Sequence, residues 1–434
     1  MNRYETYKDS GIPWLGEIPE HWNICRLKDE VTFNDEVLGD KTDTDYEILY
    51  VDISNVSLIE GIIQKELMTF EHSPSRARRI VKNGDVIVST VRTYLKAITQ
   101  IQDAEDNLIV STGFAVLRPK ADLFPRFLGY WVQSENMIGA IVSNSVGVSY
   151  PAINATDLVR LPIVKLPKKE QIAIVHYLDT KLGEIDALIG KQQTLLDKLA
   201  EQRTAVITHA VTKGLNPAAP MKNSGVEWLG DVPAHWETWK ITHAIDLIGS
   251  GTTPKSDNTE YYDGDVLWVT TSELRENFIS DTKQKVSNSA IKDYSALKIY
   301  PVNSVAMAMY GATIGRLGIL EKEATFNQAC CVFGISKILY YKFLFYWLWH
   351  RRPILISLSN GGGQPNLSQD DLKKLKVPIP GYEEQVAIAD YLDQETAKID
   401  RLCDTVNQTI GRLKEYRTAL ITQAVTGKIK VTDE

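Results

Sequence analysis

One stretch of sequence decides the fold: Lys8-Asp9-Ser10-Gly11-Ile12-Pro13-Trp14-Leu15-Gly16-Glu17-Ile18-Pro19-Glu20-His21-Trp22, which recurs as Lys222-Asn223-Ser224-Gly225-Val226-Glu227-Trp228-Leu229-Gly230-Asp231-Val232-Pro233-Ala234-His235-Trp236. The offset is 214 residues, and 9 of the 15 positions are identical. A second match has the same offset, because residues 170–212 and 384–426 share 20 of 43 positions. The chain of 434 residues is therefore two copies of one unit followed by a short tail.

The middles of the two copies, about 24–145 and 238–359, resemble each other only weakly. A trace survives where Tyr50-Val51-Asp52-Ile53-Ser54 echoes Trp268-Val269-Thr270-Thr271-Ser272. Drift after duplication is one explanation. Drift alone does not leave the flanking segments so similar, so the pattern favours one fold that carries two functionally different surfaces.

The repeated segments that follow each middle predict long helices. Apolar residues recur with a 4-3-4-3 spacing, which is typical of a coiled-coil seam. The seam positions are Leu178, Ile185, Gln192, Leu199 and Val206 in the first copy, and Leu392, Ile399, Val406, Leu413 and Leu420 in the second. A helix of about 38 residues would be roughly 57 Å long.

Two such helices in one chain can pair. We expect an antiparallel coiled coil, because parallel pairing would require the middle segment to return the whole length of a helix. Polar Gln192 and Arg203 in the seam would then fix its register. The alternative is that each helix packs only on its own domain.

The middles read as mixed α/β domains. Buried strands are expected at 86–89, 266–269 and 304–309, and helices at 124–133 and 340–349. The predicted fold class is α+β, with two tandem-duplicated units that each combine a mixed α/β domain with a long helix. We expect boundaries at 1–156, 157–216, 217–370 and 371–434.

Composition excludes several classes of protein. With 48 Lys+Arg and 55 Asp+Glu, the net charge of −7 gives no whole-chain signal for nucleic acid or membrane binding. The four cysteines form no C-x-x-C pair, which favours free thiols in a reducing compartment over a zinc site. The most apolar stretch, 343–349, is far shorter than a membrane span. We expect a cytoplasmic protein.

Catalytic motifs are not evident. The loop Gly249–Ser256 resembles a phosphate-binding loop, but Pro254 stands where that motif needs glycine and has no N–H to donate. His21 and His235 lie in matching Pro-x-His-Trp contexts with no evident nucleophile or carboxylate partner, so a structural role is favoured. We predict no catalytic residue and no metal ligand in this chain.

The repeated segments of this chain also resemble those of a known protein family. The opening Ser-Gly-x-x-Trp-Leu-Gly-x-x-Pro-x-His-Trp resembles the specificity (S) subunit of Type I restriction–modification systems. So does Leu-x-x-Pro-x-Pro-x-x-x-Glu-Gln-x-x-Ile, which stands here at 375–388. The first copy departs from it, with Val164 and Leu166 in place of the prolines. The resemblance covers the whole chain.

The resemblance implies two target recognition domains, 1–156 and 217–370, which read the halves of a bipartite, asymmetric double-stranded DNA site. The helices would set the spacer and dock methyltransferase (modification) subunits, typically two. Those partners would hold S-adenosylmethionine and methylate adenine N6, and restriction subunits using ATP and Mg would join some complexes. This chain itself would bind no cofactor.

Neither middle is basic, with net charges of −5 over 24–156 and +2 over 240–369, so DNA contacts must be clustered. In the first copy the candidates are Arg76, Arg78, Arg79 and Lys82, then Thr90, Arg92, Tyr94 and Lys96 after the strand 86–89. In the second they are Lys255, Tyr310, Thr313 and Arg316, with Asn360 and Gln364 as candidate readers of adenine. Arginine can bond guanine bidentately, and Asn or Gln can do the same with adenine. A solvated charged surface, or a plain loop at 360–366, remains the alternative.

Two other functions stay open at this point. One is a coiled-coil adaptor that binds proteins through two duplicated domains, and DNA dependence of binding separates it from a specificity subunit. The other is a fused restriction or methylation enzyme, against which the missing catalytic motifs argue.

Overall fold

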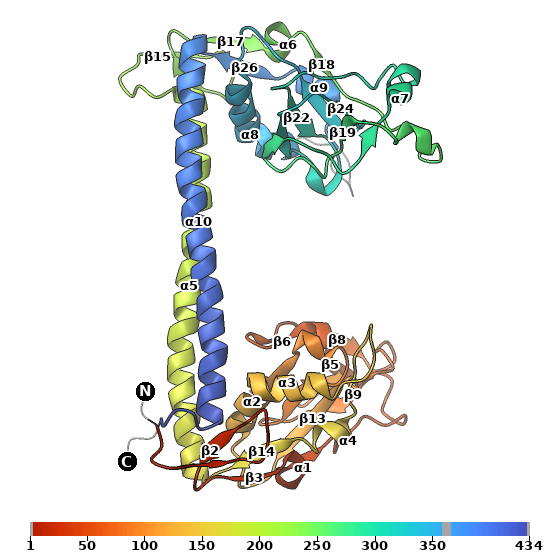
Figure 1. Cartoon of the computed structure of the whole chain (residues 1–434), viewed down its shortest axis with the longest axis vertical. Helices are drawn as coiled ribbons and strands as arrows, with labels where there is room; N and C mark the ends of the chain where they lie inside the picture. The colour runs from red at the N-terminus through yellow and green to blue at the C-terminus, as the bar shows by residue number, and fades with distance from the viewer. Residues whose placement is uncertain (1–2, 358–365, 432–434) are drawn as a thin grey trace. The chain divides into compact units, whose positions relative to one another are not determined.

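The computed structural model describes residues 3–357 and 366–431 (Figure 1). The chain divides into two compact units: unit 1 comprises residues 1–193 and 407–434, and unit 2 comprises residues 194–406. Each unit therefore holds one variable middle, the beginning of one long helix and the end of the other. This division does not follow the two sequence copies, and the reason is that the long helices run in opposite directions.

Unit 1 builds its middle from short strands and helices. Its elements are β1 (Tyr7–Asp9), β2 (Glu17–Pro19), β3 (Asn23–Arg26), α1 (Leu27–Glu30), β4 (Val31–Phe33), β5 (Glu47–Val51), η1 (Ile53–Asn55), β6 (Val56–Ser57), β7 (Gly61–Ile62), β8 (Glu66–Thr69), β9 (Ala77–Ile80), β10 (Val86–Ser89), η2 (Thr93–Leu95), β11 (Ile98–Gln100), β12 (Leu108–Ser111), β13 (Phe114–Pro119), α2 (Pro125–Gln133), α3 (Glu135–Ser143), α4 (Ala155–Leu158) and β14 (Pro162–Lys165). The long helix α5 (Lys168–Lys213) begins here, directly after Pro167.

Unit 2 repeats this plan with different lengths. Its elements are β15 (Met221–Asn223), β16 (Asp231–Pro233), β17 (Glu237–Lys240), α6 (Ile241–Ala244), β18 (Ile248–Gly249), η3 (Thr259–Tyr261), β19 (Val266–Val269), β20 (Asn277–Ile279), β21 (Lys285–Val286), α7 (Asn288–Asp293), β22 (Val305–Ala308), η4 (Gly311–Thr313), β23 (Leu317–Leu320), β24 (Ala324–Phe326), β25 (Cys330–Phe333), α8 (Tyr341–Ser357), α9 (Gln369–Lys373) and β26 (Lys376–Ile379). The second long helix, α10 (Tyr382–Val425), begins in this unit.

The two middles share a sheet plan. Unit 1 has two four-stranded sheets, β11-β10-β13-β4 and β8-β5-β12-β9, and unit 2 has a five-stranded sheet β18-β25-β22-β23-β20 and a three-stranded sheet β21-β19-β24. Strands β5 and β12 pair in parallel, and so do their counterparts β19 and β24. The strands predicted at 86–89 and 266–269 are confirmed, and that at 304–309 is shorter by one residue at each end.

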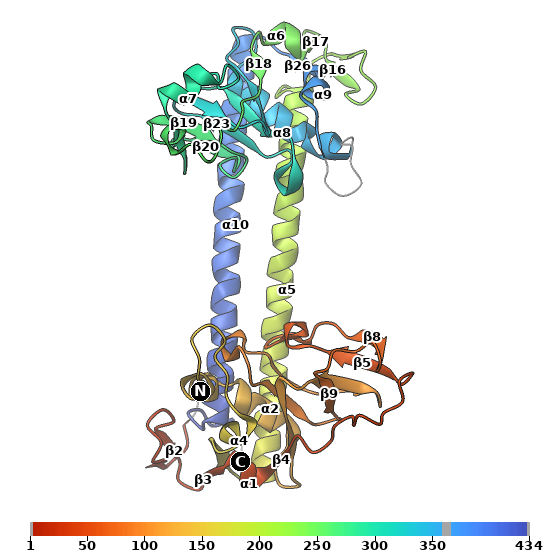
Figure 2. The same cartoon turned by 90° about the vertical axis from the view of Figure 1, so that its right-hand side faces the viewer.

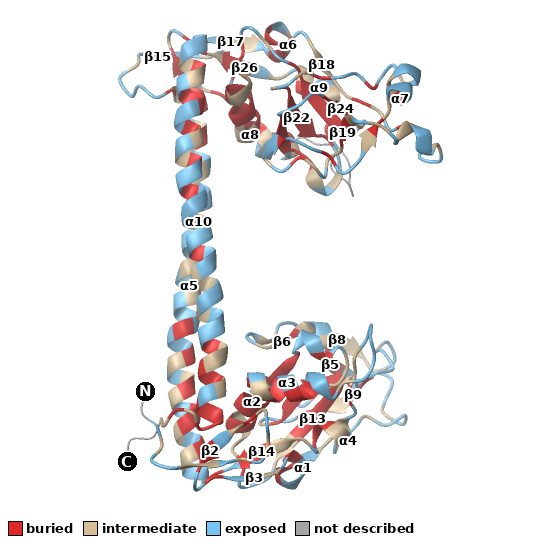
Figure 3. Cartoon of the chain, in the orientation of Figure 1, coloured by how far each residue is buried: buried red, intermediate tan, exposed pale blue. Residues whose placement is uncertain are grey.

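The helices α5 and α10 are longer than predicted, with 46 and 44 residues. They lie side by side as an antiparallel pair in both views (Figures 1 and 2). In unit 1, Leu178, Leu182 and Ile185 of α5 share a core with Leu420 and Ile421 of α10. Buried residues lie mainly where each helix packs beside a middle, and the stretch halfway along both helices is largely exposed (Figure 3). The predicted antiparallel coiled coil is confirmed.

One ion pair in each unit joins the two helices at matching positions. In unit 1, Nε of Arg417 lies 3.1 Å from a carboxylate oxygen of Asp186, and in unit 2 Arg203 pairs with Asp400. Arg203 and Arg417 are repeat equivalents, and so are the two aspartates. In an antiparallel pair with one register, the residue numbers of facing positions always add up to the same value. The two ion pairs meet this condition, since 186 and 417 have the same sum as 203 and 400.

Most of the predicted seam is buried. The exposed fraction is 0% for Leu178 and Leu392, and at most 6% for Ile185, Leu199, Ile399, Val406 and Leu420. Gln192, Val206 and Leu413 are half-buried. Trp131 and Trp347, which lie in the helices predicted at 124–133 and 340–349, are fully buried. Helix α8 runs eight residues beyond its predicted end, whereas the equivalent helix of unit 1 breaks at Ser134.

Candidate nucleic-acid interface

A buried glutamine fixes each middle to the start of its long helix. In unit 1 the side chain of Gln171 accepts from the N–H of Phe124 at 2.8 Å and donates to the carbonyls of Asp122 and Leu166, both at 3.0 Å. In unit 2 Gln385 accepts from the N–H of Tyr340 at 2.8 Å and donates to two carbonyls at 2.9 Å. Both glutamines are buried, and all their polar atoms are hydrogen-bonded. They therefore fix the first turns of α2 and α8 to the paired helices α5 and α10, which are called the frame below.

The glutamate before each glutamine binds the Pro-x-His-Trp motif. Nε2 of His21 lies 3.0 Å from Glu170, and Nε2 of His235 lies 2.8 Å from Glu384. The expectation that these histidines lack a carboxylate partner is therefore wrong, because the partner is about 150 residues away in sequence. In unit 1 the hydroxyl of Tyr4 also donates to Glu170, and burial, followed by this bond, raises the pKa of Tyr4.

The two clusters of candidate residues in unit 1 meet at one turn, residues 111–113, at the end of β12. The N–H of Thr112 donates to the carbonyl of Arg76, and the N–H and hydroxyl of Thr90 both donate to the carbonyl of Gly113. The strands β9 and β10 belong to different sheets, so sequence alone could not show this contact. The result is one continuous edge, the unit 1 edge, made of residues 76, 90–96 and 111–113.

The loop at this edge, residues 90–96, is strained. Arg92 and Lys96 have φ angles of +50° and +53°, a left-handed conformation that costs of order 1 kcal/mol or more for a residue with a Cβ. Both side chains are exposed, and Tyr94 is 52% exposed. The guanidinium carbon of Arg92 lies 4.9 Å from the centre of the Tyr150 ring. The folded middle therefore presents two exposed cations on a loop that has a strained backbone conformation.

The four arginines and lysines of the first candidate cluster differ in how their side chains are held. Arg76 donates to Asp52 at 2.7 Å, and the guanidinium of Arg78 packs 4.5 Å from the centre of the Phe70 ring. Arg79 is half-buried, its Nε has no hydrogen-bond partner, and burial lowers its pKa. Of this cluster, Arg76 is the residue that lies at the unit 1 edge.

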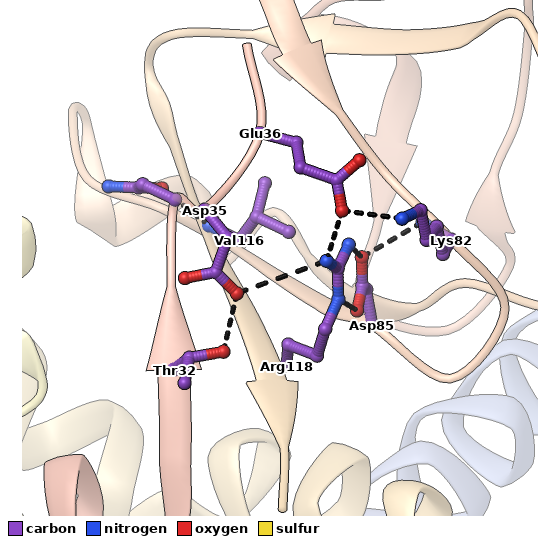
Figure 4. A network of polar contacts seen from close by, with 8 residues as sticks. Thr32, Asp35, Glu36, Lys82, Asp85, Val116 and Arg118 are labelled. Carbon is purple, nitrogen blue, oxygen red and sulfur yellow. Dashed lines mark hydrogen bonds and ion pairs between the residues drawn. The ribbon is translucent and has the colours of Figure 1, made fainter.

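Lys82 belongs to a separate polar network (Figure 4). Its ammonium donates to Glu36 at 2.5 Å, and Arg118 joins Glu36 to the buried Asp85 through bonds of 2.6, 2.8 and 2.7 Å. The pKa of Glu36 is lowered, first by its bond to Lys82 and then by Arg118. This network ties β4, β10 and β13 together, which makes Lys82 the weakest DNA candidate of its cluster.

Unit 2 has an equivalent edge at the turn 327–329, after β24. The N–H of Met309, just before the loop 310–316, donates to Ala329, and the hydroxyl of Thr253 donates to Gln328 at 2.6 Å. A Cβ at Gly251 would lie 1.6 Å from the carbonyl oxygen of Phe326, so only glycine allows this approach. The unit 2 edge therefore joins the loop 250–256 to the loop 310–316.

The candidates at the unit 2 edge differ in exposure. Arg316 and Lys255 are exposed, Tyr310 is 38% exposed, and Thr313 donates to the carbonyl of Tyr310 at 3.3 Å. A β-bridge joins Tyr310 to Asn366, as one joins Val91 to Ala152 in unit 1. Asn360 and Gln364 lie outside the described residues and remain predictions.

Sequence reasoning missed part of each edge. Tyr150, Val146 and Val148 are 66%, 81% and 101% exposed in the loop beside Arg92, and Gln328 lies in the turn of unit 2. Exposed apolar side chains that lie close together in one loop are typical of an interaction surface. The available signal was the Gly147–Pro151 turn sequence between two buried segments, which indicates a loop but not its exposure.

A groove of about 990 Å³ lies in unit 1 between the first turns of α5, residues 4–6 and residues 430–431. Its lining includes Ile172, Ala173 and Tyr177 and the two lysines Lys169 and Lys181. Among residues 3–357 and 366–431, no group of three or more His, Cys, Asp or Glu residues could hold a metal ion. No helix within the same ranges is long and apolar enough to cross a bilayer.

Comparison with known proteins gives consistent results. The model of the Type I restriction modification DNA specificity domain matches residues 21–196 and again residues 233–411. The MjaVIII type I restriction enzyme specificity subunit of Methanocaldococcus jannaschii is 22% identical, over 95% of this chain and 94% of its own. The EcoBI specificity subunit of Escherichia coli is 25% identical over 67% of this chain and 63% of its own.

Two solved structures share the fold. A chain from a study of complex assembly and conformational transition of the type I R-M system superposes with a TM-score of 0.75 at 22% identity, over 95% of this chain and 99% of the other. The HsdS subunit from Thermoanaerobacter tengcongensis superposes with a TM-score of 0.53 at 22% identity, over 95% and 98%.

Proposed function

Because the chain belongs to the Type I restriction modification DNA specificity family, we propose that its two middles read the two halves of one bipartite, asymmetric DNA site. The alternative of a protein-binding adaptor is not favoured by these relatives. Neither is a fused enzyme, since the relatives are named as specificity subunits. The target recognition domains are 1–156 and 217–370, and the helical regions are 157–216 and 371–434.

One observation carries the proposal: one frame holds two chemically different edges at the same place. Gln171 and Gln385 make the same three bonds, and in both units a turn after the parallel strand joins two loops. The unit 1 edge presents Arg92, Tyr94 and Lys96, and the unit 2 edge presents Tyr310 and Arg316 on a glycine-containing loop. A conserved frame with divergent loops is what reading two different sequences requires.

The residues at the edges then take distinct roles. Arg92 and Arg316 are the candidate readers of base edges, because their forked donors match guanine. Lys96, Lys255 and Arg76 are candidate phosphate contacts, which position the duplex and make affinity depend on salt. Arg78, Arg79 and Lys82 are weaker candidates because they do not belong to the unit 1 edge.

The partners complete the chemistry. Two methyltransferase subunits dock on the helical frame, carry S-adenosylmethionine, flip the target adenine and methylate N6. Restriction subunits with ATP and Mg join where cleavage occurs. The edges of this chain only bind and position DNA.

Methylome sequencing tests the function. DNA from cells that contain this chain and its methyltransferase partner should carry a bipartite N6-methyladenine motif, and deletion of this chain should remove it. Exchange of residues 24–156 for the equivalent segment of a relative should change one half of the motif only. If methylation persists after the deletion and the purified complex does not bind DNA, the proposed function is wrong and the protein-binding adaptor is favoured.

The spacer gives a second test. A heptad inserted into both α5 and α10, at positions paired in the antiparallel register, adds about 10 Å, or about three base pairs at ~3.4 Å each. The two half-motifs should stay unchanged while the spacer lengthens. An unchanged spacer would show that the helices do not set it. Insertion into α5 alone is the control, because it breaks the register and should abolish methylation.

A further inference from the structure

The outer faces of the two long helices are equivalent in the repeat but opposite in charge. The first face consists of Lys169, Ile172, Ala173, His176, Tyr177 and Lys181, all of which line the groove of unit 1. The second face, at the equivalent positions of α10, consists of Glu383, Val386, Ala387, Asp390, Tyr391 and Glu395. The spacing of three and four residues places each set on one side of its helix.

The apolar part of the face is kept. Ala173 and Tyr177 recur as Ala387 and Tyr391, and Ile172 is replaced by another β-branched residue, Val386. Ile172 is 45% exposed and Tyr391 is 39% exposed. A repeated, partly exposed apolar strip on both helices suits two copies of one partner.

The charged part is inverted. Lys169 becomes Glu383, His176 becomes Asp390, and Lys181 becomes Glu395. Even the local ion pair is reversed, because Lys181 pairs with Glu184 and Glu395 pairs with Lys398. A partner group that faces one position on both helices therefore meets opposite charges.

Neighbouring charges do not cancel this difference. Around the first face the groove also contains Glu5, Glu170 and Lys430, and Glu170 is already bonded by Tyr4 and His21. Glu384, beside the second face, is bonded by His235 and Trp236 in the same way. The glutamate–histidine contact is common to both faces, so the contrast rests on Lys169 and Lys181, which are replaced by glutamates, and on Asp390, which stands in place of His176.

Resting on the proposed docking of methyltransferase subunits, we infer that the two docking faces are inequivalent. A segment of the methyltransferase that carries both acidic and apolar side chains occupies the groove of unit 1 first. Its acidic side chains are attracted by Lys169 and Lys181, and its apolar side chains pack on the apolar strip. The same segment meets Glu383, Asp390 and Glu395 at the second face, where repulsion weakens binding. Assembly is therefore ordered, with a one-to-one complex before the two-to-one complex.

Titration of the methyltransferase subunit into the full chain, followed by native mass spectrometry, tests this order. At about 50 mM salt the one-to-one complex should accumulate, and at about 500 mM the first step should weaken while the second strengthens or stays level. Hydrogen exchange should show protection of residues 168–184 before residues 382–398. Equal intrinsic affinities of the two sites, after allowance for the statistical factor between the steps, with the same salt dependence, would overturn the inference.

Two matched triple variants sharpen the test. Glu383→Lys/Asp390→His/Glu395→Lys gives the second face the charges of the first, and should tighten the second step by about tenfold. Lys169→Glu/His176→Asp/Lys181→Glu does the reverse, and should weaken the first step by about as much. If Lys169→Glu/His176→Asp/Lys181→Glu instead tightened the first binding step, the partner segment would not be acidic and the inference would be overturned.

The failure of this inference differs from a failure of the proposed function. If the methyltransferase binds neither face of the unaltered chain, the docking role itself is lost. If it binds both faces equally, only the inequivalence is lost. Tyr177→Ala and Tyr391→Ala, which remove the shared apolar strip, should each weaken one step and thereby assign it to a face.

Discussion

Units 1 and 2 use the same bonds where they hold the frame and different bonds where they meet solvent. The clamps of Gln171 and Gln385, the Glu170–His21 and Glu384–His235 contacts and the two interhelical ion pairs recur with matching partners. The edges share only a plan, with Arg92 and Lys96 in one loop and Gly311 and Gly315 in the other. Frame and surface have therefore been under different constraints within one chain.

The largest effect is expected at the glutamine clamps. Gln385→Met keeps the length of the side chain but leaves one N–H and two carbonyls buried without partners, which costs about 3 kcal/mol or more. Gln171→Met should cost the same in unit 1. Hydrogen exchange around residues 338–344 and 122–128 reports each unit separately. Gln394→Met, on an exposed position of α10, is the control, and a clamp variant no worse than this control would contradict the role of the clamp.

A smaller effect separates the units by pH. In unit 1 the hydroxyl of Thr422 accepts from the backbone N–H of Glu135, which lies in the first turn of α3 because α2 ends at Gln133. In unit 2 the helix α8 continues, and the equivalent Thr208 is bonded instead by Nδ1 of His350, at 3.0 Å. Burial, followed by the charge of Arg351, lowers the pKa of His350 from 6.5 to about 4.

The sign of the pH effect follows from that shift. Between pH 6.5 and 4 the unfolded chain binds a proton that folded His350 does not, so stability falls as pH falls. The expected loss is about 2 kcal/mol at pH 5 relative to pH 7. Denaturant unfolding at both pH values should show this loss, and His350→Asn should remove it. A loss unchanged in the variant would assign acid sensitivity to other groups.

The interhelical ion pairs should differ by about 1 kcal/mol. The side chain of Arg417 is 10% exposed, against 26% for Arg203, so its unpaired charge is worse solvated. Asp186→Ala should therefore cost about 1–2 kcal/mol, and Asp400→Ala less than about 1 kcal/mol. Equal costs would mean that burial does not decide the strength of these pairs. Asp186→Ala/Arg417→Met should recover part of the loss, because no charge is then left buried.

The frame was largely predictable because its sequence occurs twice in the chain. The 214-residue offset identified the duplication, and the a/d spacing identified α5 and α10 and most of their buried seam. Helix length was underestimated, because α5 and α10 have 46 and 44 residues whereas the seam spacing indicated about 38. The Glu–Gln motif was visible, but its bonds to Phe124 and His21 join segments distant in sequence and needed the fold.

The edges were less predictable, because a loop is defined by its neighbours. Arg76 and Thr90 meet only through the turn at Gly113, which comes from another strand pair. Lys82 looked equal to Arg92 in sequence, and only the positions of Glu36 and Arg118 separate them. Exposure of Tyr150 beside Arg92 depends on a β-bridge that no local pattern indicates.

The smallest expected effect concerns backbone strain at the unit 1 edge. Lys96 has the left-handed conformation that Gly315 has in unit 2, where a Cβ would lie 2.6 Å from Cγ of Arg352. Lys96→Gly should relieve strain of about 1 kcal/mol, partly offset by the entropy of glycine in the unfolded chain, so the net gain in stability is below about 1 kcal/mol. Lys96→Ala keeps the strain and removes the same charge, which makes it the matched control. Both variants should lose one phosphate contact, seen as a salt slope of log affinity for DNA that is smaller by about 0.9. A greater loss of DNA affinity in Lys96→Gly than in Lys96→Ala would show that the strain itself positions Arg92, whereas equal losses assign the effect to charge alone.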